Sequence, residues 1–373
     1  MSGAANGRIT SSAALIRTAV NPDCDLVAAI ALEQESEPEI YRQIVGRKYE
    51  GEYGIRPSLV RRGAKFEINN HANDAMPLRK RIAEAFGYAG PEDVLVRDLD
   101  KEEPVSGHVH IGNLRRFRKT QKIVLNAYRR KADIPDLVIH PTLELPLLKA
   151  PDGQPLIRGS RYLNPDFMVL HRALGVYLIG DEKSFIVRDD TVVEPGKLDQ
   201  VRRQIASGTL AMRHELQSID RSAPIISDGL LIFASPYGLS ASKMVQENLA
   251  GEIRQIENAI PQLQRVAVTL ATLRAQGLHQ LAAMAPHLNT QLRESCYGRC
   301  IMVQHCEQLP QNAAAALGSD VQKLLGGKTP GEIAALAATA GLLPRRETAL
   351  LEGIKQAAHV LGIDIATYLQ EVA

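Results

Sequence analysis

Two aspartates and a lysine lie beside two short apolar runs, which we expect to pair as a β-hairpin. The runs are joined by Arg172–Gly175, a four-residue loop ending in glycine, the residue that most easily accepts a positive φ. This loop sets a register in which paired residue numbers sum to 347, so that Asp166 lies opposite Asp181. Because side chains alternate along a strand, Lys183 shares the face of Asp181 and Glu182 points the other way.

The chemistry that these side chains could perform is phosphodiester hydrolysis. Two carboxylates at this separation repel each other unless a cation lies between them, and hard divalent ions such as Mg²⁺ or Mn²⁺ prefer oxygen ligands. The ammonium group of Lys183 could hold a water for attack and stabilise the charge that develops on phosphorus. The alternative is a surface hairpin with an Asp–Lys cross-strand pair, which contributes little.

The four cysteines form a second set of residues with possible chemistry. Cys24 stands alone, whereas Cys296, Cys300 and Cys306 fall within eleven residues. Disulfides are rare in a reducing compartment, so this arrangement favours a zinc site or an iron–sulfur cluster. The alternative is four unrelated buried cysteines, because cysteine also packs as a small hydrophobic residue.

Taken together, in their order along the chain, these motifs resemble those of a known nuclease family. Pro165-Asp166, then fourteen residues, then Asp181-Glu182-Lys183, is similar to the PD-(D/E)xK signature, and Arg203-Gln204 is similar to the glutamine motif of its RecB-like branch. One upstream cysteine and three clustered downstream cysteines resemble the iron–sulfur members of that branch, such as the CRISPR-associated RecB-like exonuclease and AddB-type nuclease domains. The resemblance extends from Cys24 to Cys306.

The resemblance implies a role for each matching residue. Asp166 and Asp181 would bind Mg²⁺ or Mn²⁺, together with the backbone carbonyl oxygen of Glu182. Lys183 would be the catalytic lysine, and Gln204 would orient the attacking water or a DNA phosphate. The four cysteines would ligate a structural 4Fe–4S cluster, with Zn²⁺ as the alternative.

The chain departs from the family pattern at three places. Glu67 stands where the family has an upstream histidine, and we expect it to serve as a further metal ligand, since carboxylates bind hard cations. His71, one helical turn later, is the alternative, although we expect it to be a solvated helix residue. Gly208 stands where the glutamine motif has tyrosine, and three residues rather than two separate Cys296 from Cys300.

A strongly basic helix is the expected DNA-binding surface. The segment from Arg115 to Lys131 carries eight Lys and Arg residues within seventeen positions. Local positive charge can follow a phosphate backbone even when net charge is small. The residues that we expect to contact DNA are Arg115, Arg116, Arg118, Lys119 and Lys122. The alternative is a solvated helix face, balanced by the acidic residues of an exposed loop at 98–104.

The elements that must position these residues suggest three regions. Residues 1–135 read as helical, and they include a helical stretch at 12–45 and the helices 59–86 and 114–131. Residues 136–240 contain β-type runs at 137–140, 143–148, 156–158, 166–170, 176–187 and 229–234, with a helix at 197–218. Residues 241–373 read as helical almost to the end. We expect an α/β fold with a restriction-endonuclease-like mixed sheet flanked by helices, and helical ends joined through the metal cluster.

Composition restricts the class of protein. The chain has 373 residues, a net charge of +2, and 4% aromatic residues with no tryptophan, which disfavours an aromatic single-strand platform. No secretory signal or membrane span is visible, so we expect a cytoplasmic protein. We expect a metal-dependent DNA nuclease whose protein partner is a helicase, integrase or defence-complex subunit. The alternatives are a catalytically inactive DNA-binding scaffold with a Cys₄ zinc site and a redox-sensing regulator.

Overall fold

The computed structural model describes residues 11–33, 37–49, 57–104, 109–145, 162–188, 191–192, 195–235, 241–293, 296, 300–307 and 309. The chain divides into two compact units. The sheet unit comprises Met1–Ala19, Ala31–Gln34 and Glu52–Val268, and the cysteine unit comprises Val20–Ile30, Glu35–Gly51 and Thr269–Ala373. These bounds differ from the expected three regions, because segments far apart in the sequence pack together in each unit.

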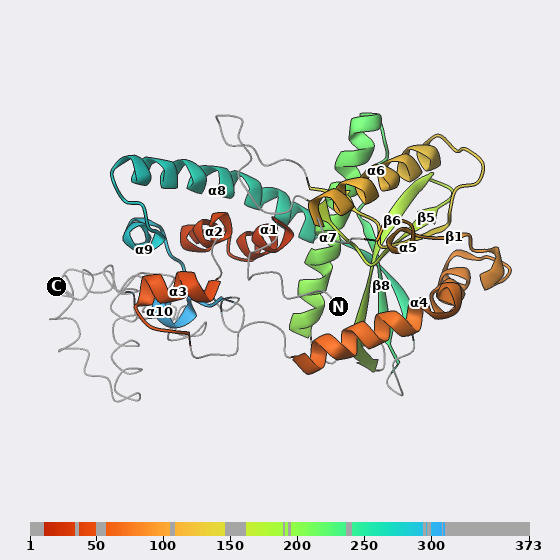
Figure 1. Ribbon diagram of the computed structural model, residues 1–373, viewed down its shortest axis with the longest axis horizontal. Coiled ribbons are helices and arrows are strands. Elements are labelled where there is room, and N and C mark those ends of the chain that lie inside the picture. The colour runs from red at the N-terminus through yellow and green to blue at the C-terminus, as the bar shows by residue number, and fades with distance from the viewer. Residues whose placement is uncertain are drawn as a thin grey trace, which may run out of the picture. The chain divides into compact units, whose positions relative to one another are not determined.

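The sheet unit is built on a mixed β-sheet whose strand order is β1-β2-β5-β6-β8-β9 (Figure 1). The strands are β1 (Val96–Asp98), β2 (Leu137–Ile139), β5 (Phe167–His171), β6 (Val176–Arg188), β8 (Asp228–Ala234) and β9 (Ala241–Asn248). The pairs β1–β2 and β6–β8 are parallel, and the other neighbours along this order are antiparallel. The strand β7 (Thr191–Val192) pairs with the end of β6, and β3 (Leu143–Glu144) pairs with β4 (Tyr162–Leu163) in a separate two-stranded sheet.

The hairpin of β5 and β6 has the register that the sequence predicts. Phe167 pairs with Gly180 and His171 with Val176, and the turn places Gly175 at φ +67°. The strand β8 is buried along Gly229–Ala234, as expected for a central strand covered on both faces. The buried part of the sheet holds in place the end of the hairpin that carries Asp166, Asp181 and Lys183.

Helices cover both faces of the sheet near the end of the hairpin that carries Asp166 and Asp181. The helix α7 (Pro195–Ile219) connects β6 to the parallel strand β8, and a Cβ atom at its Gly208 would lie 3.0 Å from Cγ2 of Ile179. The helix α4 (Pro57–Phe86) contacts the Glu182 side chain instead, through Asn70. Ile179 and Glu182 point to opposite faces because side chains alternate along β6. The helix α4 breaks at 72–75, where three consecutive residues have positive φ, and the sheet unit also contains α1 (Ser11–Val20), α5 (Leu99–Glu102) and α6 (Val109–Tyr128).

Several expected elements are confirmed and others are corrected. Strands at 137–140, 166–170, 176–187 and 229–234 and helices at 114–131 and 197–218 are present within a few residues, whereas the expected run 156–158 and the C-terminal residues 310–373 lie outside the described residues. The region after residue 240, expected to be helical, begins with β9, because pairing with β8 overrides its weak local preference.

The N-terminal part of the chain needs two further corrections. The helical stretch at 12–45 is three helices, α1, α2 (Asp25–Leu32) and α3 (Glu37–Val45). The expected acidic loop at 98–104 is instead the end of β1 followed by α5, because Leu99 is fully buried and anchors this segment.

The cysteine unit is mainly helical. It contains most of α2, then α3, α9 (Leu281–Met284), a 3₁₀ turn η2 (Ala285–His287) and α10 (Val303–Glu307). The helix α8 (Ala250–Ala275) begins in the sheet unit, and its last residues belong to the cysteine unit. Among the described helices, none combines the length and the apolar character that crossing a bilayer requires.

Candidate metal centre

The hairpin brings Asp166, Asp181 and Lys183 together, as the sequence predicts. Asp166 lies directly before β5, and its Oδ2 atom accepts a hydrogen bond of 2.7 Å from the backbone N–H of Glu182. The Lys183 ammonium lies 2.6 Å from Oδ1 of Asp181. These contacts join the start of one strand to the middle of its neighbour, which is the arrangement that the register requires.

The electrostatics of the hairpin carboxylates, Asp166 and Asp181, favour a bound cation. Burial and the adjacent charge of Asp181 raise the pKa of Asp166 well above its usual range. Burial lowers the pKa of Lys183, but the charges of Asp181 and Asp166 outweigh it and raise that pKa. Oδ2 of Asp181 is buried without a hydrogen-bond partner. A pair of carboxylates in this state fits a hard cation, which would relieve the repulsion and satisfy the unpartnered oxygen.

The side chain of Glu182 turns to α4, on the opposite face of the sheet. Its Oε2 atom accepts a 2.8 Å hydrogen bond from Nδ2 of Asn70, and its Oε1 atom lies 3.0 Å from Nε2 of His71. The side chain of His71 is only 12% exposed. The expectation that His71 is a solvated helix histidine is therefore wrong, because the buried carboxylate of Glu182 holds it.

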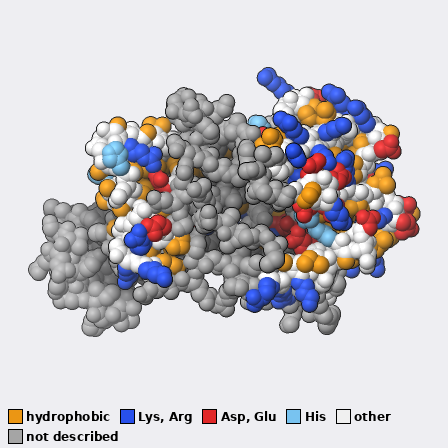
Figure 2. Space-filling model, viewed as in Figure 1, with side chains coloured by type: hydrophobic (Ala, Val, Ile, Leu, Met, Phe, Trp, Pro, Cys, Tyr) orange, Lys and Arg blue, Asp and Glu red, His pale blue; other side chains and the backbone are white. Residues whose placement is uncertain are grey.

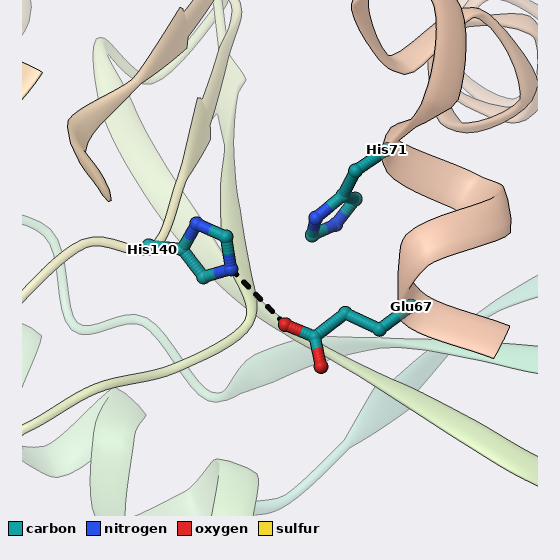
Figure 3. A group of neighbouring side chains, drawn as sticks. All are labelled: Glu67, His71 and His140. Carbon is teal, nitrogen blue, oxygen red and sulfur yellow. Dashed lines mark hydrogen bonds and ion pairs between the residues drawn. The ribbon is translucent and has the colours of Figure 1, made fainter. Parts of the chain in front are cut away.

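A second polar group, the histidine cluster, consists of Glu67, His71 and His140 (Figure 3). One ligand atom from each of these residues lies within 4.8 Å of the others. Nε2 of His140 lies 3.0 Å from Oε1 of Glu67, and Nδ1 lies 3.2 Å from Oδ1 of Asp98. Although burial opposes it, contact with these two carboxylates raises the pKa of His140 to about 9. His140 in turn lowers the pKa of Glu67, against the effect of burial.

The histidine cluster adjoins the hairpin carboxylates through the backbone. The N–H of His140 donates a 2.9 Å hydrogen bond to the carbonyl oxygen of Asp166. His140 follows β2 with φ +52°, a left-handed conformation that non-glycine residues seldom adopt. The pairing of β2 with β1 and β5 brings Asp98 and Asp166 to the same end of the sheet. On the face shown in Figure 2, acidic and histidine side chains lie beside one another with basic side chains nearby.

Within the described residues, neither Glu67 nor Gln204 makes a hydrogen bond to Asp166 or Asp181. Among the described residues, Glu67 groups with the two histidines and not with both hairpin carboxylates. Gln204 is exposed on α7, and within the described part of the chain its side chain makes no hydrogen bond to Asp166 or Asp181. The position of α4 decides which neighbours Glu67 contacts, and the sequence of α4 does not specify where that helix packs.

Sequence reasoning missed Asp98 and His140. The acidic pattern predicts a solvated loop around Asp98, yet the Asp98 side chain is 11% exposed and contacts His140. His140 is a polar residue in a β-type run, and the sequence pattern specifies no role for it. One feature of the sequence could have identified His140. It directly follows the buried run Leu137–Ile139, and the ends of neighbouring strands lie together at one edge of a sheet.

The basic helix α6 is present, but its cations divide into two groups. Arg116 is 6% exposed, pairs with Asp100 and donates to the carbonyl oxygen of Glu103. Lys119 forms ion pairs with Glu102 and Glu103. Arg116 is therefore unavailable to DNA, because it joins α6 to α5, and Lys119 is partly neutralised. The three exposed cations of the expected surface are Arg115, Arg118 and Lys122, and Figure 2 shows Lys and Arg side chains over the region of α6.

The cysteine unit brings the four cysteines close together, and none forms a disulfide. The backbone N–H of Asp25 donates a 2.8 Å hydrogen bond to Asn289, whose side chain donates to Asp23. Burial raises the pKa of Cys306, and the charges of the other three thiols raise it further. Burial likewise raises the pKa values of Cys24 and Cys296.

The spacing of the four sulfurs is wider than a single zinc ion requires. Zinc–thiolate bonds of about 2.3 Å place tetrahedral sulfurs roughly 3.8 Å apart. Among the described residues, no three of the cysteine sulfurs lie within 4.8 Å of one another. A four-iron cubane holds its sulfurs farther apart, because each thiolate binds a different iron.

Comparison of the chain with protein-family models, curated proteins and solved structures finds no match.

Proposed function

We propose that this chain is a metal-dependent DNA nuclease that hydrolyses phosphodiester bonds at the hairpin of β5 and β6. The observation that carries the proposal is the close set of Asp166, Asp181 and Lys183, in which Asp181 is buried and its Oδ2 atom lacks a hydrogen-bond partner. Buried groups in such a state are costly, so their retention fits a functional role better than a structural one.

The residues of the hairpin would divide the work. Asp166 and Asp181 would hold a hard divalent cation, Mg²⁺ or Mn²⁺, between their carboxylates. Such an ion supplies Lewis-acid polarisation of a phosphoryl oxygen and lowers the pKa of bound water. Against the effect of burial, the charges of Asp181 and Asp166 raise the pKa of Lys183, and its ammonium group would stabilise negative charge developing on the phosphate. The backbone carbonyl of Glu182 remains a proposed additional ligand.

The order of elements supports this assignment. An antiparallel hairpin, β5–β6, is followed by α7 and by a strand β8 that is parallel to β6. This order resembles the restriction-endonuclease-like core of PD-(D/E)xK nucleases. The departure at Gly208 has a steric reason, because a Cβ atom there would already lie 3.0 Å from Ile179 and 3.7 Å from Pro165. A side chain at this position would require Ile179 to shift.

DNA would be bound along the exposed side of α6. Arg115, Arg118 and Lys122 lie three and four residues apart, so they share one face of the helix. Phosphate contacts from such a face orient a nucleic acid without reading its sequence. The DNA would therefore be positioned through its phosphate backbone and not through its bases.

The four cysteines would hold a structural 4Fe–4S cluster. All four lie in the cysteine unit, and Cys24, Cys296 and Cys306 are buried, which suits a structural metal cluster, with zinc as the alternative. The proposed cluster would link Cys24 to the segment 296–306 and thereby stabilise the cysteine unit, because metal binding energy adds to folding energy.

The decisive experiment is DNA cleavage by protein purified anaerobically. Labelled single- and double-stranded DNA would be incubated with Mg²⁺ or Mn²⁺ and wild-type protein, Lys183→Ala or the matched control Lys80→Ala, which removes an exposed lysine of α4. We expect metal-dependent cleavage by the wild type and the control, and a loss of at least about 100-fold in Lys183→Ala. Cleavage that survives in Lys183→Ala contradicts the proposed site, and DNA binding with no cleavage by any variant favours the scaffold alternative.

A further inference from the structure

We propose that Glu67, His71 and His140 form a second metal site, distinct from the hairpin carboxylates and selective for a transition-metal ion such as Mn²⁺, Fe²⁺ or Zn²⁺. The three residues come from α4 and from the end of β2, and their side chains converge in Figure 3. Two imidazoles and one carboxylate form a ligand set typical of borderline divalent metals. The site does not depend on whether the chain cleaves DNA.

Carboxylates outside the cluster orient both of its histidines. Nδ1 of His140 is held by Asp98, and Nε2 of His71 is held by Glu182. Each imidazole thus contacts a carboxylate outside the cluster through one nitrogen, and the second nitrogen of His140, Nε2, faces Glu67 within the cluster. Carboxylates that orient histidines in this way are a regular feature of metal sites, where they fix the tautomer and raise the basicity of the ligand.

The same carboxylates are themselves held in place. Glu182 is almost fully buried, and Asn70 donates a hydrogen bond to its second oxygen. Asp98 accepts from the backbone N–H of Asp100. Rings fixed by two rigid carboxylates lose little entropy when a metal binds, so the cluster is preorganised for an ion.

The cluster is open to solvent on one side. The side chain of Glu67 is 42% exposed, whereas those of His71 and His140 are 12% and 24% exposed. A bound ion would therefore keep positions for water or for an oxygen of a ligand. The 2.9 Å hydrogen bond from the backbone N–H of His140 to the carbonyl oxygen of Asp166 joins the segment that carries this ligand to the start of the hairpin.

The test measures Mn²⁺ binding, because manganese prefers oxygen and nitrogen ligands and avoids the cysteines. Free Mn²⁺ would be followed by electron paramagnetic resonance during titration of chelator-treated, full-length protein. The variants are His71→Ala and His140→Asn, the latter because asparagine tolerates positive φ. His214→Ala, an exposed histidine on α7, is the matched control, and Asp181→Asn removes the hairpin site.

We expect His71→Ala and His140→Asn each to lose about one equivalent of bound Mn²⁺, or to bind it at least about 10-fold more weakly, while His214→Ala binds as wild type. Asp98→Asn should weaken binding by about 10-fold without abolishing it. Asp181→Asn should retain the equivalent that the histidine variants lose.

Two results would overturn the proposal. The first is unchanged Mn²⁺ binding in both histidine variants, with circular dichroism showing that they are folded. The second is loss of the same equivalent in Asp181→Asn, which would mean one shared site. A protein that binds this equivalent yet cuts no DNA supports the metal site and contradicts the nuclease function, so the two proposals fail separately.

Discussion

Glu215 is a carboxylate whose pKa is raised mainly by burial. It is half-buried on α7 and accepts a 2.8 Å hydrogen bond from Gln121 of α6. Burial raises its pKa, the hydrogen bond from Gln121 and the charge of His214 lower it, and the charge of Glu144 raises it. Because the net shift is upward, the ionised form destabilises the folded state above the folded pKa, and this cost disappears as the pH falls below the unfolded value.

We therefore expect Glu215→Gln to raise the free energy of unfolding at pH 7 by about 1 kcal/mol or less, since solvent screens a half-buried charge. The gain should vanish near pH 3.5, where the wild-type carboxyl is protonated in both states. Urea unfolding of the wild type and of Glu215→Gln between about pH 3.5 and pH 7 measures this difference in the free energy of unfolding. A Glu215→Gln protein that is less stable than wild type at pH 7 would contradict the assignment of burial as the dominant cause.

Single residues also show what the sequence could and could not predict. The loop length and Gly175 were sufficient to give the hairpin register, so Asp166, Asp181 and Lys183 were placed correctly. Asp98 and His140 were not, because their approach depends on parallel pairing of β1 with β2, which are about forty residues apart. Local patterns specify neighbours across a tight turn, whereas distant pairings are decided by the packing of the whole sheet.

At the scale of elements, α6 separates structural cations from surface cations. Arg116 joins α6 to α5, while Arg118 and Lys122 lie on the exposed side. Helical periodicity alone predicted the helix but gave no means of sorting its charges, since the partners of Arg116 belong to a segment expected to be a loop. The position of α5 beside α6 decides which cations remain exposed.

We expect Arg116→Ala to lower the free energy of unfolding by about 1–3 kcal/mol, because it leaves the Glu103 carbonyl without its donor. The double variant Arg118→Ala/Lys122→Ala should keep its stability within about 0.5 kcal/mol. It should instead weaken DNA binding and reduce the salt dependence, by about one unit of slope for each lost phosphate contact. Thermal unfolding and DNA titration at several salt concentrations measure the two effects. A double variant that binds DNA with the wild-type salt slope excludes α6 as the DNA surface.

At the scale of the whole molecule, the two units are discontinuous in sequence. The cysteine unit takes one stretch around Cys24 and another that begins at Thr269. The sequence predicted that Cys24 would join the downstream cysteines and that a β-rich region, 136–240, would lie between them, but not that α1, which precedes Cys24, would belong to the sheet unit.

We expect Cys296→Ala to lose bound iron, solubility and nuclease activity together, since the proposed cluster holds two distant segments. Met302→Leu, a volume-conserving change at a buried position between Cys300 and Cys306, is the matched control and should behave as wild type. Metal analysis, visible absorption and cleavage of anaerobic protein check this. An active, well-folded Cys296→Ala protein without iron would rule out a structural cluster, and zinc in the wild type would identify the alternative metal.

The discontinuity of the cysteine unit also has a consequence for synthesis on the ribosome. Cys24 leaves the exit tunnel 282 residues before Cys306, and at about 5–20 residues per second this interval lasts roughly 15–60 s. During that time the sheet unit between them can fold, while the first segment of the cysteine unit waits with its apolar residues Leu26–Ile30 uncovered. Insertion of any cluster must therefore follow translation of the last cysteine.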